Sequence, residues 1–271
     1  MPTLIVAARS FVCSVGGTPP LSAVYDQRVI AAAESIGWSV LGAADDWISD
    51  DVPDPVVYVT TELAMSTACS LDLALLEPSF DLLTRVPERF LRRHVESATF
   101  GDLDRLDGRT FVKPADPLDK WFDAGLYSDV RDIRTCGRSR PEAPILLSEP
   151  VEWSVEFRYF VLEGKAVAGS PYLAYGRPAW RWSATASPIP TAGLHVVEGL
   201  CAAMEGELPP AFVVDVGRID DRGWAVVEFN PVWSAGLLNA DARAVLPVLQ
   251  RATRPRPISH ASDQRWDLRG G

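Results

Sequence analysis

The sequence predicts a mixed α/β (α+β) protein, with a small N-terminal α/β subdomain followed by two α+β subdomains. In the first third of the chain, short apolar strands alternate with helical stretches, which is typical of a parallel α/β layer. Later, paired apolar runs flank polar, glycine-containing turns, which indicate antiparallel hairpins. A chain of 271 residues, 47% of them hydrophobic, is long enough for two or three small subdomains.

The N-terminal α/β subdomain is expected over residues 1–85. No basic stretch precedes its first apolar run, so this run is interpreted as a strand and not as a signal peptide. Its expected elements are a strand at Thr3–Ala8, a helix at Ala23–Ile36, and strands at Trp38–Leu41 and Pro55–Thr60.

The central subdomain is expected over residues 86–150. Its expected elements are a helix at Pro87–Ser97, a short turn at Phe100–Leu106, and strands at Thr110–Pro114 and Ile145–Glu149. The first of these strands ends in a lysine, which is costly to desolvate at the end of an apolar run unless it meets an anion.

The C-terminal subdomain is expected over residues 151–253. Beyond it the sequence is polar, contains two prolines and ends in Gly-Gly, so we expect residues 254–271 to form a flexible tail. The expected elements are strands at Val155–Leu162, Ala166–Gly169, Ala211–Ile219 and Trp224–Phe229, a helix within Pro188–Glu205 and a helix at Ala240–Arg251.

Composition narrows the classes of partner. The net charge of −10 argues against a nucleic-acid partner, because binding a polyanion requires clustered basic residues. It does not exclude ATP, which requires only a few well-placed cations and a metal. No run of about 18 apolar residues occurs, so no membrane span is expected. Four widely separated cysteines form no metal-like or redox pair, and we expect reduced thiols in a cytoplasmic protein.

The strongest candidate site lies on the hairpin formed by the last two strands. Counting back from a loop of two or four residues gives one register. It pairs Ile219 with Trp224, Gly217 with Val226 and Asp215 with Glu228. Because side chains alternate between faces, Asn230 shares the face of Glu228. A three-residue loop with a bulge would break this pairing.

Two carboxylates placed opposite each other destabilise a strand pair unless a cation lies between them. Mg²⁺ fits this set, because it usually takes one or two protein carboxylates together with substrate phosphates. The alternative is that Asp215 and Glu228 lie on a solvated face. The valine-rich sequence around both residues argues against that alternative.

Several motifs together resemble the ATP-grasp family. Glu228-Phe229-Asn230-Pro231, on a strand paired with that of Asp215, is similar to the family's metal-binding hairpin. The strand ending at Lys113 resembles the one whose lysine holds nucleotide phosphates. The segment Leu146–Val151 resembles the hinge strand that binds adenine through its backbone.

Within the family, the closest likeness is to a clade named for one arginine and two lysines. Arg158 would be the arginine, and Lys113 and Lys120 the lysines. The resemblance covers about residues 110 to 240. Two departures stand out. The stretch that corresponds to the family's glycine-rich loop contains only Gly125, and valine occupies position 213, where many carboxylate ligases of the family carry an arginine.

The resemblance implies roles for the hinge strand and the strand that follows it. Pro150 has no N–H, so adenine would be bound by the Glu149 C=O and the Val151 N–H. Glu156 would bind the ribose, and Arg158 the γ-phosphate or an acyl phosphate. A simple ion pair between Glu156 and Arg158, which share one face of a strand, remains the alternative.

The roles implied for the two lysines and for one loop each have an alternative. Lys113 would hold phosphate, or else extend to the surface. Lys120 would assist it, or else belong to an ion-pair cluster with neighbouring aspartates. The polar and aromatic loop from Tyr175 to Trp182 would bind the acceptor, or else cover the site.

The function implied is an ATP- and Mg²⁺-dependent ligase that joins a carboxylate to an amine or a similar nucleophile through an acyl phosphate. Arg158 and Lys120 would be its catalytic residues. A small-molecule kinase of the same fold and a non-catalytic nucleotide-binding module are the alternatives. The carboxylate would belong to a small molecule or a peptide. The oligomeric state stays open, with a homodimer as one option.

Overall fold

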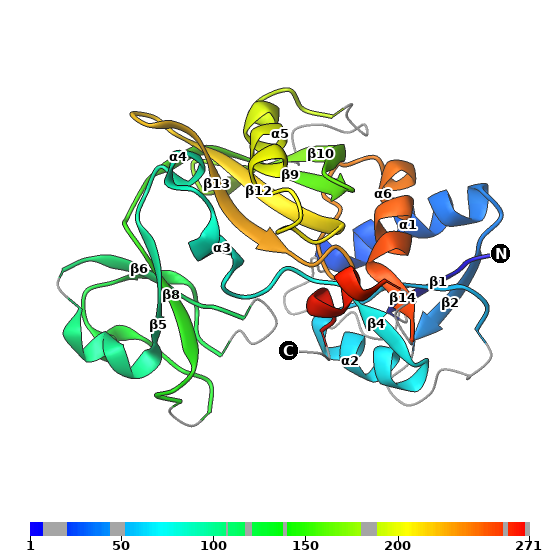
Figure 1. Cartoon of the computed structure of the whole chain (residues 1–271), viewed down its shortest axis with the longest axis horizontal. Helices are drawn as coiled ribbons and strands as arrows, with labels where there is room; N and C mark the ends of the chain where they lie inside the picture. Colours follow the sequence, from blue (N-terminus) through cyan, green and yellow to red (C-terminus); the bar gives the residue numbers. More distant parts are fainter. Residues whose placement is uncertain are drawn as a thin grey trace.

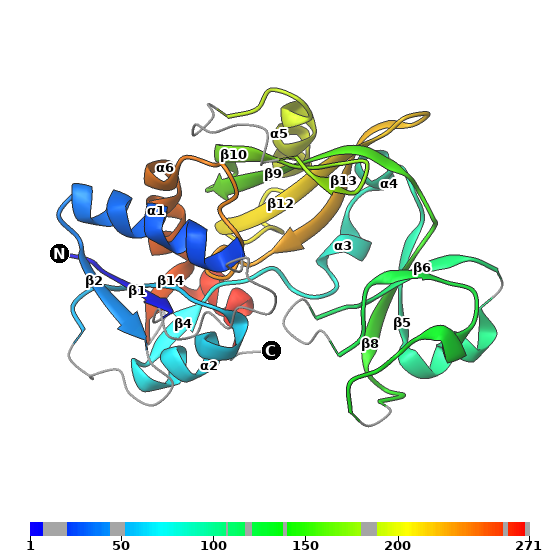
Figure 2. The same cartoon turned by 180° about the vertical axis from the view of Figure 1, so that it is seen from behind.

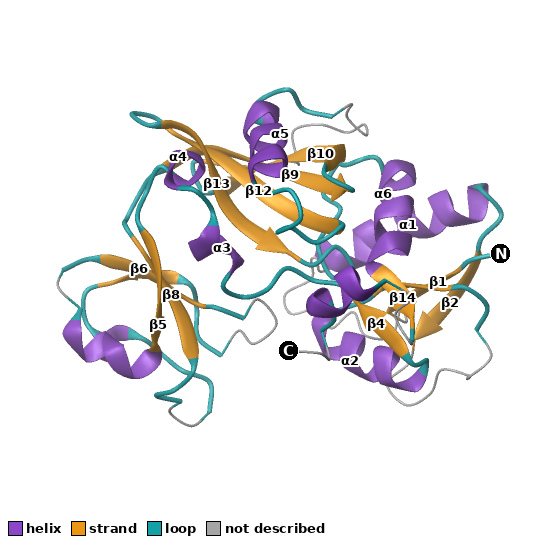
Figure 3. Ribbon diagram, viewed as in Figure 1, coloured by secondary structure: helices purple, strands orange, loops and turns teal. Residues whose placement is uncertain are grey.

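The structure is a computed structural model that describes residues 1–7, 21–43, 52–106, 108–116, 121–137, 140–179, 189–256 and 260–268. The N-terminal elements and the last helices lie at one end of the molecule, a five-stranded sheet lies in the middle, and a four-stranded sheet lies at the other end (Figure 1). The mixed α/β class expected from the sequence is confirmed (Figure 3).

The N-terminal layer is a parallel sheet in the order β2 (Ser39–Ala43), β1 (Thr3–Ala7), β3 (Pro55–Tyr58). Helix α1 (Leu21–Ser35) packs against β1 and β2. These elements confirm the expected strands and helix. Two further elements follow along the chain that the sequence analysis did not predict, the helix α2 (Thr61–Ser70) and the buried strand β4 (Leu73–Leu75).

The central sheet is antiparallel. Its order is β5 (Val95–Thr99), β8 (Pro144–Ser148), β6 (Thr110–Pro114), β7 (Gly125–Tyr127). One face packs on an aromatic cluster that includes Trp121 and Phe122. The short helices η2 (Phe100–Arg105) and η3 (Val130–Asp132) complete this end of the molecule.

The helix expected at Pro87–Ser97 is wrong for most of its length. After the short helix α3 (Leu82–Arg85), a single turn, α4 (Glu88–Leu91), ends where Arg92 adopts a left-handed conformation with φ of 50°. Strand β5 follows, and Val95 pairs with Ser148. Backbone pairing with the neighbouring strand therefore overrides the local helical preference of this segment.

The middle sheet has the order β11 (Arg177–Pro178), β10 (Lys165–Ala174), β9 (Trp153–Leu162), β12 (Ala211–Ile219), β13 (Gly223–Asn230). Helix α5 (Leu194–Ala203) covers one face, and α6 (Ala242–Ala252) covers the other beside α1 (Figure 2).

Alternation along β12 assigns its side chains to the two faces of this sheet. Phe212, Val214 and Val216 pack in the cluster that contains α5. Ala211 and Val213 pack in the cluster that contains α6. Asp215 continues the second series, so it lies on the α6 side of the sheet, in line with the pleat.

The expectation of a flexible tail after residue 253 differs from what the structure shows. Strand β14 (Thr253–Pro255) pairs with β4, and the short helix η5 (Ala261–Trp266) buries Trp266, which is 5% exposed. The Leu268 N–H donates to Leu75 O at 2.9 Å. Backbone bonds and one large aromatic residue thus outweigh the polar composition of the segment.

Candidate active site

The hairpin of β12 and β13 places Asp215 opposite Glu228, as the sequence predicts. The register nearer the turn is different. Ile219 pairs with Gly223 and Gly217 with Ala225, so the expected Ile219–Trp224 and Gly217–Val226 pairs are wrong. The loop has three residues, which shifts the register by one. A bulge at Val227 then shifts it back, so the bulge restores the carboxylate pair that we expected it to break.

Asp215 is fully buried and is held by a guanidinium from the adjacent strand β9. Arg158 Nε donates to Asp215 Oδ1 at 2.9 Å, and Nη2 donates to Oδ2 at 2.7 Å. Arg158 Nη1 also donates to Gly236 O at 3.3 Å, and the guanidinium carbon lies 4.8 Å from the centre of the Tyr172 ring. A fork-to-fork pair of this kind fixes both side chains in one orientation.

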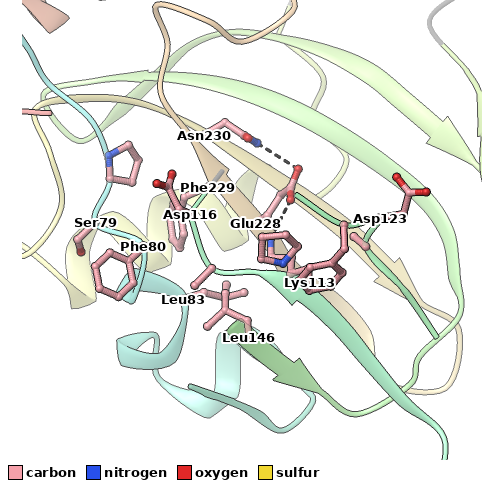
Figure 4. A pocket seen from close by; sticks show the side chains of 15 residues that line it. Ser79, Phe80, Leu83, Lys113, Asp116, Asp123, Leu146, Glu228, Phe229 and Asn230 are labelled. Atoms are coloured by element: carbon pink, nitrogen blue, oxygen red, sulfur yellow. Dashed lines mark hydrogen bonds and ion pairs between the residues drawn. The ribbon is translucent and has the colours of Figure 1, made fainter. Parts of the chain in front are cut away.

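Glu228 has a different cation, which comes from the central sheet. Lys113 Nζ donates to Glu228 Oε2 at 3.0 Å, and the amide of Asn230 donates to Glu228 Oε1 at 3.1 Å (Figure 4). The same amide lies 3.5 Å from Asp215 Oδ2. The three residues expected to bind metal therefore meet at one point between two sheets.

Electrostatics in this group depend on its cations. Burial acts to raise the pKa of Glu228, but Lys113, Asn230 and Arg158 together lower it to about 2. Burial acts to lower the pKa of Arg158, and the adjoining Asp215 reverses this and raises it. Burial raises the pKa of Asp215 even though Arg158 pairs with it. Protein cations contact both carboxylates, at the place that the sequence assigned to a divalent ion.

The donor set of this group suits a hard cation. Among the described residues, no cluster of three or more His, Cys, Asp or Glu side chains could hold a metal. Two carboxylates and one amide remain, and Mg²⁺ is commonly held by one or two carboxylates with substrate phosphates completing its shell. Asp215, Glu228 and Asn230 fit this pattern once the amide turns its oxygen inward.

Two cavities meet at Lys113 and Glu228. The hinge cavity, of about 360 Å³, is mostly apolar and lies between the end of β8 and the Val227 bulge. Its lining includes Leu83, Arg93, Leu146, Glu149, Val151, Trp153 and Val227. The Asp116 cavity, of about 300 Å³, extends the other way. Its lining includes Ser79, Phe80, Asp116, Asp123 and Asn230 (Figure 4).

The residues expected to bind adenine, Glu149 and Val151, both line the hinge cavity. The Val151 N–H makes no hydrogen bond within the described part of the chain. The Glu149 C=O accepts a hydrogen bond from Ser148 Oγ at 3.2 Å. The Glu149 side chain points elsewhere, to Arg222, whose guanidinium donates to its two oxygens at 2.9 and 2.6 Å.

Glu156 lies on the same face of β9 as Arg158 but does not pair with it, because Arg158 is bound to Asp215. Glu156 is 7% exposed. Burial, and then the charges of Asp215 and Glu228, raise its pKa to about 7. The alternative of a Glu156–Arg158 ion pair is therefore not what the structure shows.

Two other expected features fall wholly or partly outside the described residues. Lys120 lies in the undescribed stretch 117–120, and the loop residues Trp180, Arg181 and Trp182 lie in the stretch 180–188. Arg177, at the start of that loop, is exposed in β11.

The sequence interpretation missed Arg93, Trp153 and Arg222. Arg93 is 7% exposed and lines the hinge cavity, and its guanidinium carbon lies 5.0 Å from the centre of the Trp153 ring. No local signal identifies it, because it stands in the run Arg92-Arg93-His94, which is typical of an exposed basic helix end.

The ATP-grasp class is defined by two sheets that face each other. Here an antiparallel sheet that carries Lys113 faces a second sheet whose hairpin carries the acidic pair, and the two cavities lie between them. The model of the ATP-grasp domain, family 2 of the clade named for one arginine and two lysines, matches residues 90–248. The chain belongs to this family.

Solved structures show the same fold. The D-cycloserine synthetase DcsG matches at 14% identity with a TM-score of 0.55, covering 92% of this chain and 99% of that one. A D-alanine–D-alanine ligase from Bacillus anthracis matches at 12% identity with a TM-score of 0.51, covering 93% and 97%. A search of curated proteins finds no match. None of the described helices has the length and apolar character needed to cross a membrane.

Proposed function

We propose that the chain is an ATP-dependent ligase that joins a carboxylate to an amine, or to a similar nucleophile, through an acyl phosphate. One observation carries the proposal. Asp215, Glu228 and Asn230 gather beside Lys113, where an apolar cavity meets a second cavity whose lining is both polar and apolar. The apolar cavity suits a purine base, and the Asp116 cavity, which contains Lys113 and the acidic residues, suits the phosphates and the acceptor.

The position of each described residue supports a role, and Lys120 keeps the role that the sequence implies. The Glu149 C=O and Val151 N–H bind the base, and Glu156 meets the ribose. Lys113 moves from Glu228 to the nucleotide phosphates, assisted by Lys120. Bound Mg²⁺ would offset the negative charge of the phosphates. Arg158 orients Asp215 through two hydrogen bonds, and its remaining N–H groups would contact the transferred phosphoryl group.

The reaction balances without a further reagent. A carboxylate oxygen of the first substrate attacks the γ-phosphorus and ADP leaves. The amine then attacks the carbonyl carbon of the acyl phosphate, so that phosphate and one proton are released. Positioning and charge stabilisation supply the rate acceleration in such transfers. The carboxylate substrate is a small molecule or a peptide.

The test is Mg²⁺-dependent binding of a non-hydrolysable ATP analogue, measured by calorimetry with Mg²⁺ and with chelator. Asp215→Asn and Glu228→Gln should each weaken binding in Mg²⁺ by about tenfold or more, equivalent to ~1.4 kcal/mol. Without metal the effect should be small. Asp220→Asn, an exposed aspartate in the loop of the same hairpin, is the matched control. Equal affinities for the wild type and all three variants in Mg²⁺ would refute the metal assignment.

A second assay separates the ligase from a kinase. A ligase should release phosphate from ATP only when both a carboxylate and an amine are supplied. A kinase should instead accumulate a stable phosphorylated product when the amine is omitted. Candidate substrates can be screened by mass spectrometry for a product that has lost one water relative to the two reactants.

A further inference from the structure

The bulge in β13 sets the direction of Glu228. Val226 pairs with Val216 and Glu228 with Asp215, which leaves Val227 as an extra residue with no partner on β12. If the register of the turn continued unbroken, Val227 would face Asp215, and Glu228 would point to the α5 side of the sheet. The bulge is therefore what places Glu228 on the side of Asp215.

The backbone of the bulge is held by a residue from another part of the chain. Arg93 Nη1 donates to Val226 O at 2.6 Å, and Nη2 donates to Val227 O at 2.9 Å. These are the carbonyls of the bulge residue and of the residue before it. Arg93 is 7% exposed, so these charge-assisted bonds lie away from bulk water, where they are strong.

The remaining donors of Arg93 are committed to its own subdomain. Nε donates to Ser148 Oγ at 3.1 Å, and Nη1 also donates to Leu91 O at 3.2 Å. Four of its five N–H groups are thus used by protein acceptors. Arg93 lines the hinge cavity, but most of its donors are already bonded to protein acceptors and are not available to a nucleotide.

We propose that Arg93 is a positioning residue for the metal-binding pair, and that it acts by clamping the Val227 bulge to β8 and α4. Its planar fork reaches carbonyls on β13 and Ser148 on β8 at once, which a lysine ammonium cannot do. The effect of Arg93 on metal binding rests on the proposed function. The hydrogen bonds that form the clamp do not depend on a bound metal.

The first experiment compares Arg93→Lys with the wild type by calorimetry, using the non-hydrolysable ATP analogue with Mg²⁺ and with chelator. The gain in affinity that Mg²⁺ provides should fall about tenfold in the variant. The affinity measured in chelator should stay within about twofold. Arg92→Lys is the matched control, because Arg92 donates to Trp224 O on the same strand but outside the bulge.

The second experiment is rescue by deletion of Val227. Without this residue, Glu228 follows Val226 and meets Asp215 in a regular ladder, with no bulge to hold. In the Arg93→Lys background, the deletion should therefore restore the effect of Mg²⁺. Failure of the rescue, or an equal loss of affinity in chelator and in Mg²⁺, would show that Arg93 contacts the nucleotide directly and would overturn the proposal.

The third measurement needs neither metal nor nucleotide. Amide hydrogen exchange in the free protein should speed up from Val226 to Phe229 in Arg93→Lys and remain unchanged in Arg92→Lys. Unchanged exchange in Arg93→Lys would contradict the clamp. If the wild type shows no effect of Mg²⁺, the proposed function fails, and this measurement still decides whether Arg93 holds the bulge.

Discussion

At the scale of single residues, the candidate site is a balance between a buried ion pair and a partly exposed one. Asp215 and Glu228 face each other, and Arg158 and Lys113 each neutralise one of them. Arg158 and Asp215 are buried neighbours on adjacent strands, whereas Lys113 reaches Glu228 from a different sheet. Lys113 is the more readily released of the two cations, because its side chain is 20% exposed and that of Arg158 is 9% exposed. A bound nucleotide would therefore compete for Lys113 first.

A partly buried carboxyl group, that of Glu77, lies outside this group. Glu77 follows β4, and its Oε2 is buried without a hydrogen-bond partner among the described residues. Burial, and then the charge of Asp116, raise the pKa of Glu77 from 4.5 to about 8. The folded protein therefore holds this proton more tightly than the unfolded chain does.

The pH dependence of stability follows from this shift. As pH rises from about 4.5 to about 8, the unfolded chain loses the Glu77 proton first, so the free energy of unfolding falls and then levels off. Glu77→Gln removes this loss. Its stability relative to the wild type should grow across that range to a few kcal/mol at most, at about 1.4 kcal/mol per pKa unit.

Urea unfolding at pH values of about 5, 6.5 and 8, which span the range of this pKa shift, measures the effect. Glu198→Gln, at an exposed position on α5, should follow the wild type at all three values. A constant difference between Glu77→Gln and the wild type over this range would show that Glu77 is ionised in the folded protein.

At the scale of elements, close packing between Gly217 of β12 and Trp153 of β9 supports the hairpin. Gly217 lies beneath the Trp153 ring, and a Cβ at position 217 would come within 2.5 Å of Trp153 Cε3 and 3.1 Å of Val227 Cγ2. The indole, the bulge and the glycine therefore form one packed unit at the wall of the hinge cavity.

Gly217→Ala should displace the Trp153 ring, which the added methyl group would meet at the shortest distance. Overpacking of this kind costs about 1–3 kcal/mol of stability, and the displaced ring should weaken nucleotide binding equally with Mg²⁺ and with chelator. Adding Trp153→Leu should recover stability, because the smaller side chain leaves room for the methyl group. Thermal unfolding and calorimetry measure both quantities. Equal stability of Gly217→Ala and the wild type would contradict the packing described.

At the scale of the whole molecule, the two ends of the chain form one unit. Strand β14 joins β4, α6 contacts α1, and η5 packs Trp266 beside the end of β4. The Trp266 C=O accepts a hydrogen bond from the Glu77 N–H at 2.8 Å, and Arg251 donates to Asp263 at 2.9 and 3.0 Å. The segment after β14 thus closes the N-terminal layer.

Trp266→Ala should lower the free energy of unfolding by about 3–5 kcal/mol, as for other large buried aromatic residues. Gln264→Ala, an exposed neighbour in η5, should change it by about 0.5 kcal/mol or less. Denaturant unfolding compares the two variants. Similar small effects for both would mean that η5 contributes nothing to the fold in solution.

The sequence by itself determined most strands of the sheets, the lysine at the end of β6 and the hairpin that sets Asp215 against Glu228. Turn residues, apolar runs and period-two alternation are local, so residues close in the chain carry the whole signal. The same locality explains the error at Pro87–Ser97, where a helical pattern yielded to strand pairing with β8.

Only the tertiary structure decided which cations meet the two carboxylates, how the bulge is held and where the C-terminal segment lies. Arg93 and Val226 are 133 positions apart, Lys113 and Glu228 are 115 apart, and Arg222 and Glu149 are 73 apart. Such contacts depend on how whole sheets pack against each other. That packing is set by the summed burial of many side chains, and no local pattern around one residue can encode it.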